Sequence, residues 1–395
     1  MLRKSSVQFG IATSRWFAAG MFLLAMVLPL SAAQPFVRRS GTRLLINGKP
    51  FRFAGANVDY LALASDSFGK IGATDIYYPS KHMIDDAFAT MNKMGGKVAR
   101  VWSSASQGCA LCVEPELGRF NEAALRQLDY VVYSAGQHRV RLILLFVDNW
   151  GYYTGGIPQF QKWRGGGDFY RDPNLLADYK GYVAALINRK NSYSGITYRD
   201  DPTILGWQPG NELRDSTLEW DREIARYIKS LDPNHLVFSG NDERGIEPER
   251  AAIAEIDVVD RHYYPRGNNP QPRWSLDRDR EAVKQAGKAF MVGEFGWDHE
   301  NLSVEQLESY LSTIEADTNI AGDLFWALRG RKDGGEFMAV PGPRDQGAAD
   351  GGWWALYYPG RTTSLNTEED MRLRVRILSG HAKAMFGAPR RLLHF

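Results

Sequence analysis

Short apolar runs alternate with amphipathic stretches along almost the whole chain, and this pattern restricts the fold more than any other feature. Eight runs have the apolar and β-branched residues, bounded by polar turns, that are typical of buried parallel strands. They are Phe51–Asp59, Lys97–Ser104, Arg141–Trp150, Ile204–Leu213, His235–Asn241, Ile256–Pro265, Phe290–Trp297 and Gly322–Arg329.

Helical patterns lie between these runs. In the first, Ser80 is the expected N-cap, and Met83, Ala87, Met91 and Met94 share one face. The predicted helices are Ser80–Met94, Asn121–Gln137, Leu175–Lys190, Ser216–Leu231, Arg280–Ala286, Ser303–Asp317 and Glu368–Phe386, with a short fifth connection at Glu247–Glu255.

Eight strand–helix repeats predict an α/β fold, a (β/α)8 TIM barrel that spans residues 34–395 as one domain. The alternative is a doubly wound open sheet. That fold would need a glycine-rich phosphate turn after the first strand, and Gly55-Ala56-Asn57 is not such a turn. Thr42–Pro50 predicts a small hairpin that turns at Asn47-Gly48.

Three long connections interrupt the regular spacing: Leu61–Pro79, Gly151–Asn174 and Arg331–Asn366. Each follows a predicted strand, so all three belong to the barrel face that carries the C-terminal strand ends. Long loops on that face usually build a substrate cleft.

The first 33 residues have the features of a secretory signal peptide. Arg3, Lys4 and Arg15 precede an apolar run, and small residues at Ser31-Ala32-Ala33 suit a signal peptidase. An uncleaved anchor is the alternative, but the run is short for a bilayer span. We therefore expect cleavage near residue 33 and a secreted or periplasmic protein.

Composition narrows the range of partners. The formal charge is +2, and removal of the signal leaves a charge near −1, without the basic excess of a nucleic-acid-binding protein. The 11 Trp and 18 Tyr provide faces suited to sugar rings, although large cores also use them. We expect no nucleic-acid partner, no membrane attachment after cleavage, and a monomer.

The chain has two cysteines, in Cys109-Ala110-Leu111-Cys112. A zinc site would need more ligands. In an exported protein a local disulfide is favoured over two free thiols.

Two glutamates end separate predicted strands, Glu212 on the fourth and Glu294 on the seventh. Polar residues at the C-terminal ends of barrel strands are typical of catalysis rather than of stabilisation. Strands four and seven lie across the barrel from each other, so we expect the two carboxylates to face each other over its mouth. Paired carboxylates are the machinery of glycoside hydrolysis.

Carboxyl groups only about 5–5.5 Å apart leave no room for a water, so one of them must attack the sugar directly. We assign Glu294 as the nucleophile and Glu212 as the acid and then the base, which makes the reaction a retaining double displacement. Glu212 must be protonated, so we expect burial and the charge of Glu294 to raise its pKa.

Other strand ends supply candidate supporting side chains. We expect Arg100 to keep Glu294 ionised, Tyr264 to donate to it, and Asn211 to bind the 2-hydroxyl of the sugar. Trp326 is a candidate floor beneath the sugar. Trp102 and His262 also end strands, although a lone buried histidine is often structural.

With these residues the chain resembles glycoside hydrolase family 5, and within it the β-mannanases. The resemblance covers nearly the whole mature chain. Its motifs are Phe36–Gly41, Asn47–Pro50, Gly55–Asn57, Gly155-Gly156, Gln159-Phe160, Trp163, Asp168–Tyr170, Tyr179-Lys180, Arg189–Asn191, Tyr198–Ile204 and Asn211-Glu212.

The resemblance implies the same roles for Glu212 and Glu294. It also implies that five residues line the cleavage subsite: Arg100, Asn211, His262, Tyr264 and Trp326. By the same matching, Trp102 and Arg214 belong to neighbouring subsites. The chain departs from the family at Leu213, where proline usually follows the acid/base, and in the unusual Gln208-Pro209-Gly210; Leu213 and Arg214 are expected to border the aglycone side.

The resemblance therefore predicts an endo-β-1,4-mannanase. An exo-acting β-mannosidase, or a hydrolase of another β-glycan, is the alternative, because Trp353 and Trp354 in the last long loop can close one end of a cleft. A sugar-binding barrel without catalysis is a third hypothesis. We expect no cofactor and no metal, since two carboxylates suffice and the seven histidines do not suggest a metal cluster.

Overall fold

The computed structural model describes residues 35–66, 75–102, 108–240, 245–264, 272–297, 303–338, 355–363 and 366–387. The chain divides into two compact units, Met1–Ala33 and Gln34–Phe395, and all described residues belong to the second. The predicted signal peptide, Trp353 and Trp354 lie outside them. Within the described part, no helix combines the length and the apolar character that a bilayer span requires.

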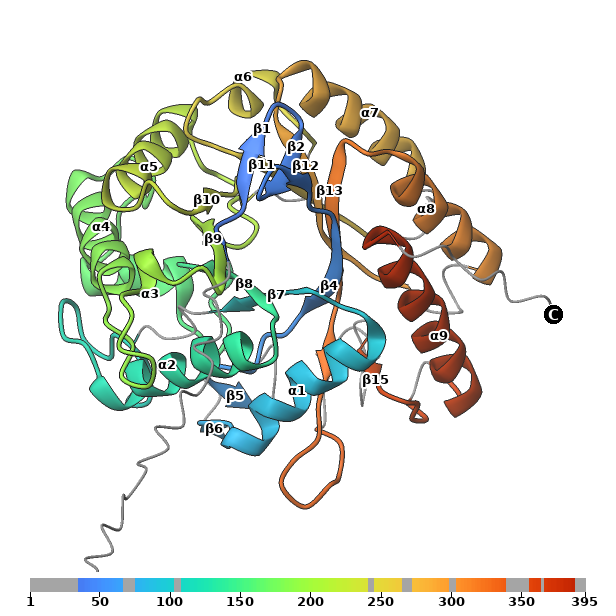
Figure 1. The fold of residues 1–395 in the computed structure, drawn as a ribbon. Coiled ribbons are helices and arrows are strands. Elements are labelled where there is room, and N and C mark those ends of the chain that lie inside the picture. The colour runs from blue at the N-terminus through green and yellow to red at the C-terminus, as the bar shows by residue number, and fades with distance from the viewer. Residues whose placement is uncertain are drawn as a thin grey trace, which may run out of the picture. The chain divides into compact units, whose positions relative to one another are not determined.

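Eight parallel strands form one sheet in the order β10-β9-β8-β7-β4-β13-β12-β11. They are β4 (Phe53–Asn57), β7 (Val98–Trp102), β8 (Arg141–Leu145), β9 (Ile204–Gln208), β10 (Leu236–Val237), β11 (Val258–Tyr263), β12 (Ala289–Phe295) and β13 (Ile320–Phe325). The bridge Phe238–Val258 joins the two edges, so the sheet closes into a barrel with helices around it (Figure 1). The predicted fold is confirmed.

The helices are α1 (Lys81–Met94), α2 (Glu122–Gln137), α3 (Gly156–Trp163), α4 (Pro173–Ile187), α5 (Leu218–Leu231), α6 (Pro248–Ala251), α7 (Pro272–Gln285), α8 (Val304–Ala316) and α9 (Glu368–Met385). Ser80 caps α1 as predicted, since its side chain accepts from the backbone N–H of Met83. Ser303 and Thr367 form capping boxes at α8 and α9, where a side chain three residues later bonds back to the cap.

The N-terminal strands β1 (Arg38–Ser40), β2 (Arg43–Ile46) and β3 (Lys49–Pro50) form a small antiparallel sheet. Asn47 and Gly48 both have positive φ, 51° and 75°, as the tight turn between β2 and β3 requires. Val37, Leu44 and Phe51 join the core cluster that fills the inside of the barrel. The predicted hairpin is therefore confirmed, and its apolar face packs on the barrel.

The three long connections contain structure that the sequence did not predict. The first holds the paired strands β5 (Ala64–Ser65) and β6 (Ile76–Tyr77), and the last pairs β14 (Leu328–Arg329) with β15 (Leu356–Tyr357). The second contains α3, which begins without a side-chain cap after Gly155. Glycine and proline in this stretch obscured the helical period.

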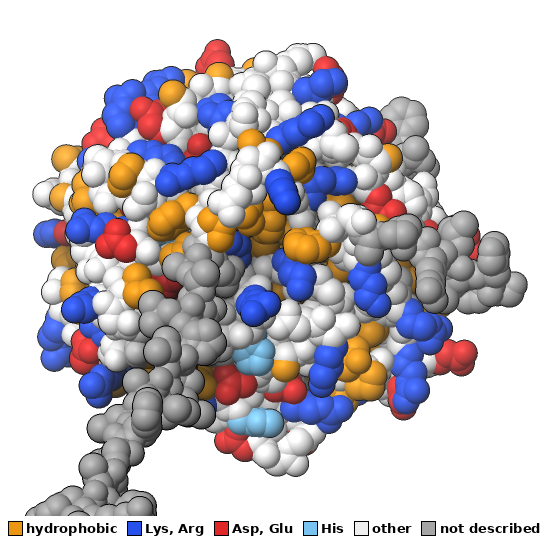
Figure 2. Space-filling view, viewed as in Figure 1, with side chains coloured by type: hydrophobic (Ala, Val, Ile, Leu, Met, Phe, Trp, Pro, Cys, Tyr) orange, Lys and Arg blue, Asp and Glu red, His pale blue; other side chains and the backbone are white. Residues whose placement is uncertain are grey.

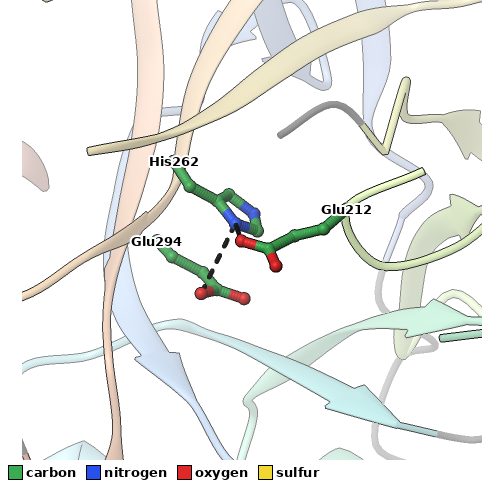
Figure 3. A group of neighbouring side chains, drawn as sticks. All are labelled: Glu212, His262 and Glu294. Carbon is green, nitrogen blue, oxygen red and sulfur yellow. Dashed lines mark hydrogen bonds and ion pairs between the residues drawn. The ribbon is translucent and has the colours of Figure 1, made fainter. Parts of the chain in front are cut away.

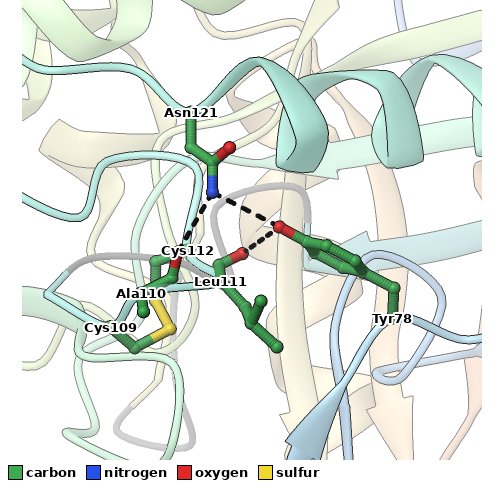
Figure 4. The surroundings of a disulfide bond; sticks show 6 residues. All are labelled: Tyr78, Cys109, Ala110, Leu111, Cys112 and Asn121. Atoms are coloured by element: carbon green, nitrogen blue, oxygen red, sulfur yellow. Dashed lines mark hydrogen bonds between the residues drawn. A yellow bond between two sulfur atoms is a disulfide. The ribbon is translucent and has the colours of Figure 1, made fainter.

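The two cysteines form a disulfide in the loop after β7, so the favoured of the two alternatives is confirmed. The loop is attached to the start of α2 and to Tyr78 (Figure 4). Asn121, the N-cap of α2, donates to the carbonyl of Ala110 at 3.1 Å, and the Tyr78 hydroxyl donates to the carbonyl of Leu111 at 2.9 Å. These contacts fix a loop on the face that bears the strand ends.

A buried histidine fastens the last helix to the barrel. His381 on α9 lies 2.8 Å from Glu315 of α8 and 2.8 Å from Asp323 of β13, and its side chain is 1% exposed. Burial alone would lower its pKa, but the two carboxylates raise it to about 9. Arg52 also interacts electrostatically with Asp323, so a second cation acts on this carboxylate beside the histidinium.

We expect His381→Gln to destabilise the protein in a pH-dependent way. The pKa of His381 is higher in the folded than in the unfolded chain, so its contribution is complete below about pH 6.5 and disappears as pH rises through about 9. The full effect is on the order of 3 kcal/mol. Urea unfolding of variant and wild type from pH 6 to 9.5 measures it. A pH-independent difference, or the same trend in the exposed control His82→Gln, would contradict this assignment.

Candidate active site

The two predicted carboxylates meet at the C-terminal ends of their strands. Glu294 is part of β12, the seventh barrel strand, and Glu212 follows β9, the fourth. The chain between β9 and Glu212 remains paired, since the Asn211 N–H donates to the Val147 carbonyl at 2.8 Å. Glu212 has a positive φ of 52°, which is unusual for a residue with a side chain and is a form of strain found at functional sites.

His262 lies between the two carboxylates (Figure 3). Its Nδ1 is 2.9 Å from Glu212 Oε1 and 3.4 Å from Glu294 Oε2. His262 and Glu294 are register partners on β11 and β12, directly after an irregularity that shifts the pairing. Gly293 leaves room for the ring, because a Cβ there would lie 3.1 Å from it. One ligand atom each of Glu212, His262 and Glu294 lies within 4.8 Å of the other two. This spacing could also accommodate a cation, which the sequence did not predict.

Glu294 is buried among hydrogen-bond donors. Arg100 Nη1 lies 2.7 Å from its Oε1, and the Tyr264 hydroxyl donates to its Oε2 at 2.5 Å. Burial raises the pKa of Glu294, and the nearby charge of Glu212 adds to this, while His262 and Arg100 oppose it. The contacts predicted for Arg100 and Tyr264 are therefore both present.

The predicted pKa of Glu212 is wrong in direction. Burial alone would raise it, but the hydrogen bond and charge of His262, the Trp150 indole N–H at 2.6 Å and the charge of Arg100 together lower it to about 2. Conversely, both glutamates raise the pKa of His262 against the effect of its burial. In the free protein both shifts favour a proton on His262 over one on Glu212.

Arg100 organises the interior end of the site. Its guanidinium bonds Glu294, Asn57 Oδ1 at 3.0 Å, Gln208 Oε1 at 2.6 Å and Asn211 Oδ1 at 2.8 Å, and it is fully buried. Asn57 and Gln208 were not predicted as site residues. Both end barrel strands, so the rule that selected Arg100 could have found them.

Aromatic side chains border the carboxylates. The rings of Trp102 and Trp326 meet edge to face with centroids 5.4 Å apart, and Arg100 lies 4.7 Å from the Trp102 ring. Arg214 lies 4.6 Å from the ring of Trp150, which itself donates to Glu212. All nine predicted site residues thus belong to one connected group, together with the unpredicted Trp150.

Leu213 is the residue that directly follows Glu212. Its side chain is 3% exposed and packs in the main core beside Gly210, where a Cβ would lie 2.6 Å from it. Its side chain is therefore part of the core, and its expected place beside the aglycone side stays a prediction. Of the two residues after Glu212, only Arg214 is partly exposed.

We expect Trp150→Phe to raise the pKa of Glu212, because the indole N–H stabilises only the ionised carboxylate. The protonation of the Glu212 carboxyl in the free protein, followed by its infrared band in difference spectra against Glu212→Gln, should then occur at a pH higher by about one unit, as expected for the loss of one charge-assisted hydrogen bond. A transition that stays in place or moves to lower pH would contradict this role. Tyr152→Phe, on a neighbouring ring 6.4 Å away, is the control.

Known proteins resemble this chain. Residues 165–255 match the family model described as GH family 5 beta-mannosidase-like. Mannan endo-1,4-beta-mannosidase 2 of Arabidopsis thaliana is 31% identical over 373 residues, which cover 78% of this chain and 83% of that protein. Mannan endo-1,4-beta-mannosidase 1 of the same plant is 28% identical over 78% of this chain and 86% of that protein. In shorter matches, the chain spans 52% of the length of two further Arabidopsis relatives.

The fold is also found among solved structures. The endo-beta-1,4-mannanase from Thermotoga petrophila superimposes with a TM-score of 0.69 at 26% sequence identity. The match covers 87% of this chain and 79% of that one. The likeness therefore extends over the barrel and is not confined to the segment that matches the family model.

Proposed function

This chain belongs to glycoside hydrolase family 5, and we propose that it is a secreted endo-β-1,4-mannanase that hydrolyses mannan with retention of configuration. The observation that carries the proposal is the pairing of Glu212 and Glu294, whose oxygens lie within 4.8 Å of each other beside His262. This spacing agrees with the separation of about 5–5.5 Å in retaining enzymes and not with the separation of about 6.5–9.5 Å in inverting ones. The names of the relatives and of the solved structure support mannan as the substrate.

In the first step, Glu294 attacks the anomeric carbon and Glu212 gives its proton to the departing glycosidic oxygen. Arg100 and Tyr264 suit Glu294 to this role, because they hold its oxygens in place and stabilise its charge before attack. The products of this step are a shortened mannan chain and a mannosyl ester on Glu294. The bond between the anomeric carbon and the glycosidic oxygen breaks, and Glu294 loses its negative charge because its oxygen now forms the ester.

Glu212 must receive a proton before it can act as the acid. We infer that it comes from His262 through the hydrogen bond of 2.9 Å. The Glu212 side chain is 13% exposed in the free protein, and a bound sugar would cover it. Removal of water favours a neutral acid–imidazole pair over an ion pair, so the proton moves toward Glu212 as the site fills.

In the second step, Glu212 is the base. It takes a proton from water, the hydroxide attacks the anomeric carbon, and the bond to Glu294 breaks. Loss of the negative charge from Glu294 in the ester removes one of the charges that raised the pKa of His262. The three groups share protons, so the pKa values seen in kinetics belong to the set and not to one residue.

The site surroundings support a polymeric substrate. Trp150 and Arg214 extend the site beyond Glu212, where the leaving part of a mannan chain would lie, and Trp102 and Trp326 lie on the side of Arg100. Indole rings and guanidinium groups suit contact with the faces and hydroxyls of sugar rings. We propose that Asn211 binds the sugar 2-hydroxyl at the cleavage point.

Export and quaternary state are also proposals. The signal-like residues 1–33 support export to the periplasm or the medium, and the protein is proposed to act as a monomer with no nucleic-acid or membrane partner. Acidic and basic side chains are interspersed on the face shown in Figure 2, in keeping with the small net charge.

A time course of products tests the proposed activity. Linear mannan and mannohexaose are each incubated with the enzyme, and an unsubstituted β-glucan is the parallel substrate. An endo-mannanase releases a mixture of manno-oligosaccharides from the first minutes. Mannose as the only early product would instead favour an exo-acting β-mannosidase, and cleavage of the glucan alone another β-glycanase. Absence of hydrolysis on every mannan substrate would refute the proposal.

A further inference from the structure

A third carboxylate adjoins the catalytic pair, and the steps described above do not use it. Asp148 lies three residues after β8 and is 2% exposed. Among the described residues, no cationic side chain pairs with it. A buried carboxylate in such a place is expensive unless its hydrogen bonds are satisfied, so its contacts indicate what it does.

Three N–H groups converge on the Asp148 carboxylate. The Trp102 indole donates to Oδ2 at 2.8 Å, while the Asn211 amide at 3.1 Å and the Trp150 backbone at 3.0 Å donate to Oδ1. The backbone is fixed too, because Asp148 and Asn211 form a parallel bridge and the Asp148 carbonyl accepts from Ile157 at 2.8 Å. The carboxylate therefore connects two strand ends and cannot easily shift.

These contacts determine which way the Asn211 amide points. Its Oδ1 accepts from Arg100 Nη2 at 2.8 Å, and its Nδ2 donates to Asp148. If the amide were rotated by 180°, its NH2 group would face the N–H groups of Arg100, and its oxygen would face the Asp148 carboxylate. Both contacts would be repulsive. An amide nitrogen carries two N–H groups, so one remains after the bond to Asp148.

We propose that Asp148 is a positioning residue that orients the Asn211 amide and the Trp102 indole, so that the second Asn211 N–H is held ready for the 2-hydroxyl of the sugar at the cleavage point. The inference rests on the proposed function. It extends that function because Asp148 would hold the Asn211 amide in place before the substrate binds. The contact between this amide and the 2-hydroxyl strengthens in the transition state.

The three donors around Asp148 support this role, because each of them favours the ionised form of the carboxylate. Burial raises its pKa to about 7, and the charge of Glu212 adds to this, although its three donors oppose the shift. All three neighbours donate, so none of them would accept a proton from Asp148, and the ionised carboxylate fits the three donors best. An asparagine at this position has one acceptor oxygen and would turn its own N–H groups toward at least one of the donors.

Asp148→Asn tests the proposal with two substrates. One is 2,4-dinitrophenyl β-mannobioside, and the other lacks the 2-hydroxyl on the sugar unit that bears the aryl group. We expect the variant to lose about 10- to 100-fold in kcat on the parent, with KM little changed, since small misplacements of a catalytic contact have effects of this size. On the deoxy substrate the loss should be less than about threefold, because the contact is absent.

A double variant separates orientation from general damage. If Asp148 acts through Asn211, then Asp148→Asn adds little to the loss caused by Asn211→Ala alone. Equal losses on both substrates, or additive losses in the double variant, would overturn the proposal. Asp148→Ser, which is smaller and keeps one acceptor, is the second variant should the asparagine variant not fold, and the same pattern is expected. Failure of the wild type to cut the parent glycoside would count against the proposed function and not against the role of Asp148.

Discussion

Replacement of Glu294 by glutamine should abolish hydrolysis of mannan, with a fall in kcat of about 10⁴-fold or more. The amide has nearly the same shape but cannot attack the anomeric carbon, so no mannosyl ester forms. An activated aryl leaving group should not restore the rate, because the missing group is the nucleophile and not the acid. Initial rates on mannan and on 2,4-dinitrophenyl β-mannobioside measure the effect.

Controls exclude a simple loss of fold. The variant should keep a thermal unfolding midpoint near that of wild type, since glutamine still fits beside Arg100 and Tyr264. Glu336→Gln, on an exposed residue after β14, is a matched change of charge that should leave activity intact. For Glu294→Gly with added azide, we expect an α-mannosyl azide, because azide attacks from the side that Glu294 vacates. Wild-type activity in Glu294→Gln would refute the assignment of the nucleophile.

Replacement of Glu212 by alanine should have the second-largest effect, and its size should depend on the leaving group. On mannan, kcat should fall by about 10²- to 10⁴-fold, the usual contribution of a general acid. On the dinitrophenyl glycoside the first step needs no acid, so the ester should form and accumulate. A burst of dinitrophenol followed by slow turnover is the expected record.

Azide distinguishes the two glutamates by stereochemistry. In Glu212→Ala it should attack the ester on Glu294 and yield a β-mannosyl azide, the opposite anomer to that from Glu294→Gly. The NMR spectrum of the isolated azide decides between them. If Glu212→Ala gave the α-mannosyl azide and Glu294→Gly the β-mannosyl azide, the roles of Glu212 and Glu294 would be exchanged.

The barrel could be predicted from the chain because each strand and helix carries its own periodic signal. The observed strand ends differ from the predicted ones by a few residues. Strand β10 is only Leu236–Val237, whereas His235–Asn241 was expected. Gly240 has a φ of 74°, which takes the chain out of the strand there. Helix α3 was missed because it begins at Gly156, directly after the capping residue Gly155, and Gly156 approaches the Asp148 carbonyl so closely that a Cβ would lie 2.5 Å from it.

The positions of the site residues could be predicted better than their electrostatics. Strand ends selected Glu212, Glu294, Arg100 and His262, and the barrel brings them together as expected. The pKa of Glu212 was predicted in the wrong direction because its donors, His262 and Trp150, are 50 and 62 residues away in the sequence. No local pattern reports hydrogen bonds of that kind.

The same limit explains why Asp148 was missed. It lies near the end of the predicted strand Arg141–Trp150, and it was not selected among the polar residues at strand ends. Only the structure reveals that it is buried and surrounded by donors from three segments. Gln208 illustrates the opposite case: it seemed unusual for the family, and its side chain bridges Arg100 and Asp260, where it donates at 2.8 Å.

The central claim is that Glu294 forms a mannosyl ester, and the configuration of the first product tests it most directly. Mannohexaose is cleaved in an NMR tube, and the anomeric signals of the new reducing ends are followed before they mutarotate. The account predicts that the β-anomer appears first and then equilibrates with the α-anomer. Initial appearance of the α-anomer would contradict it, because a single inverting displacement by water would then be the mechanism.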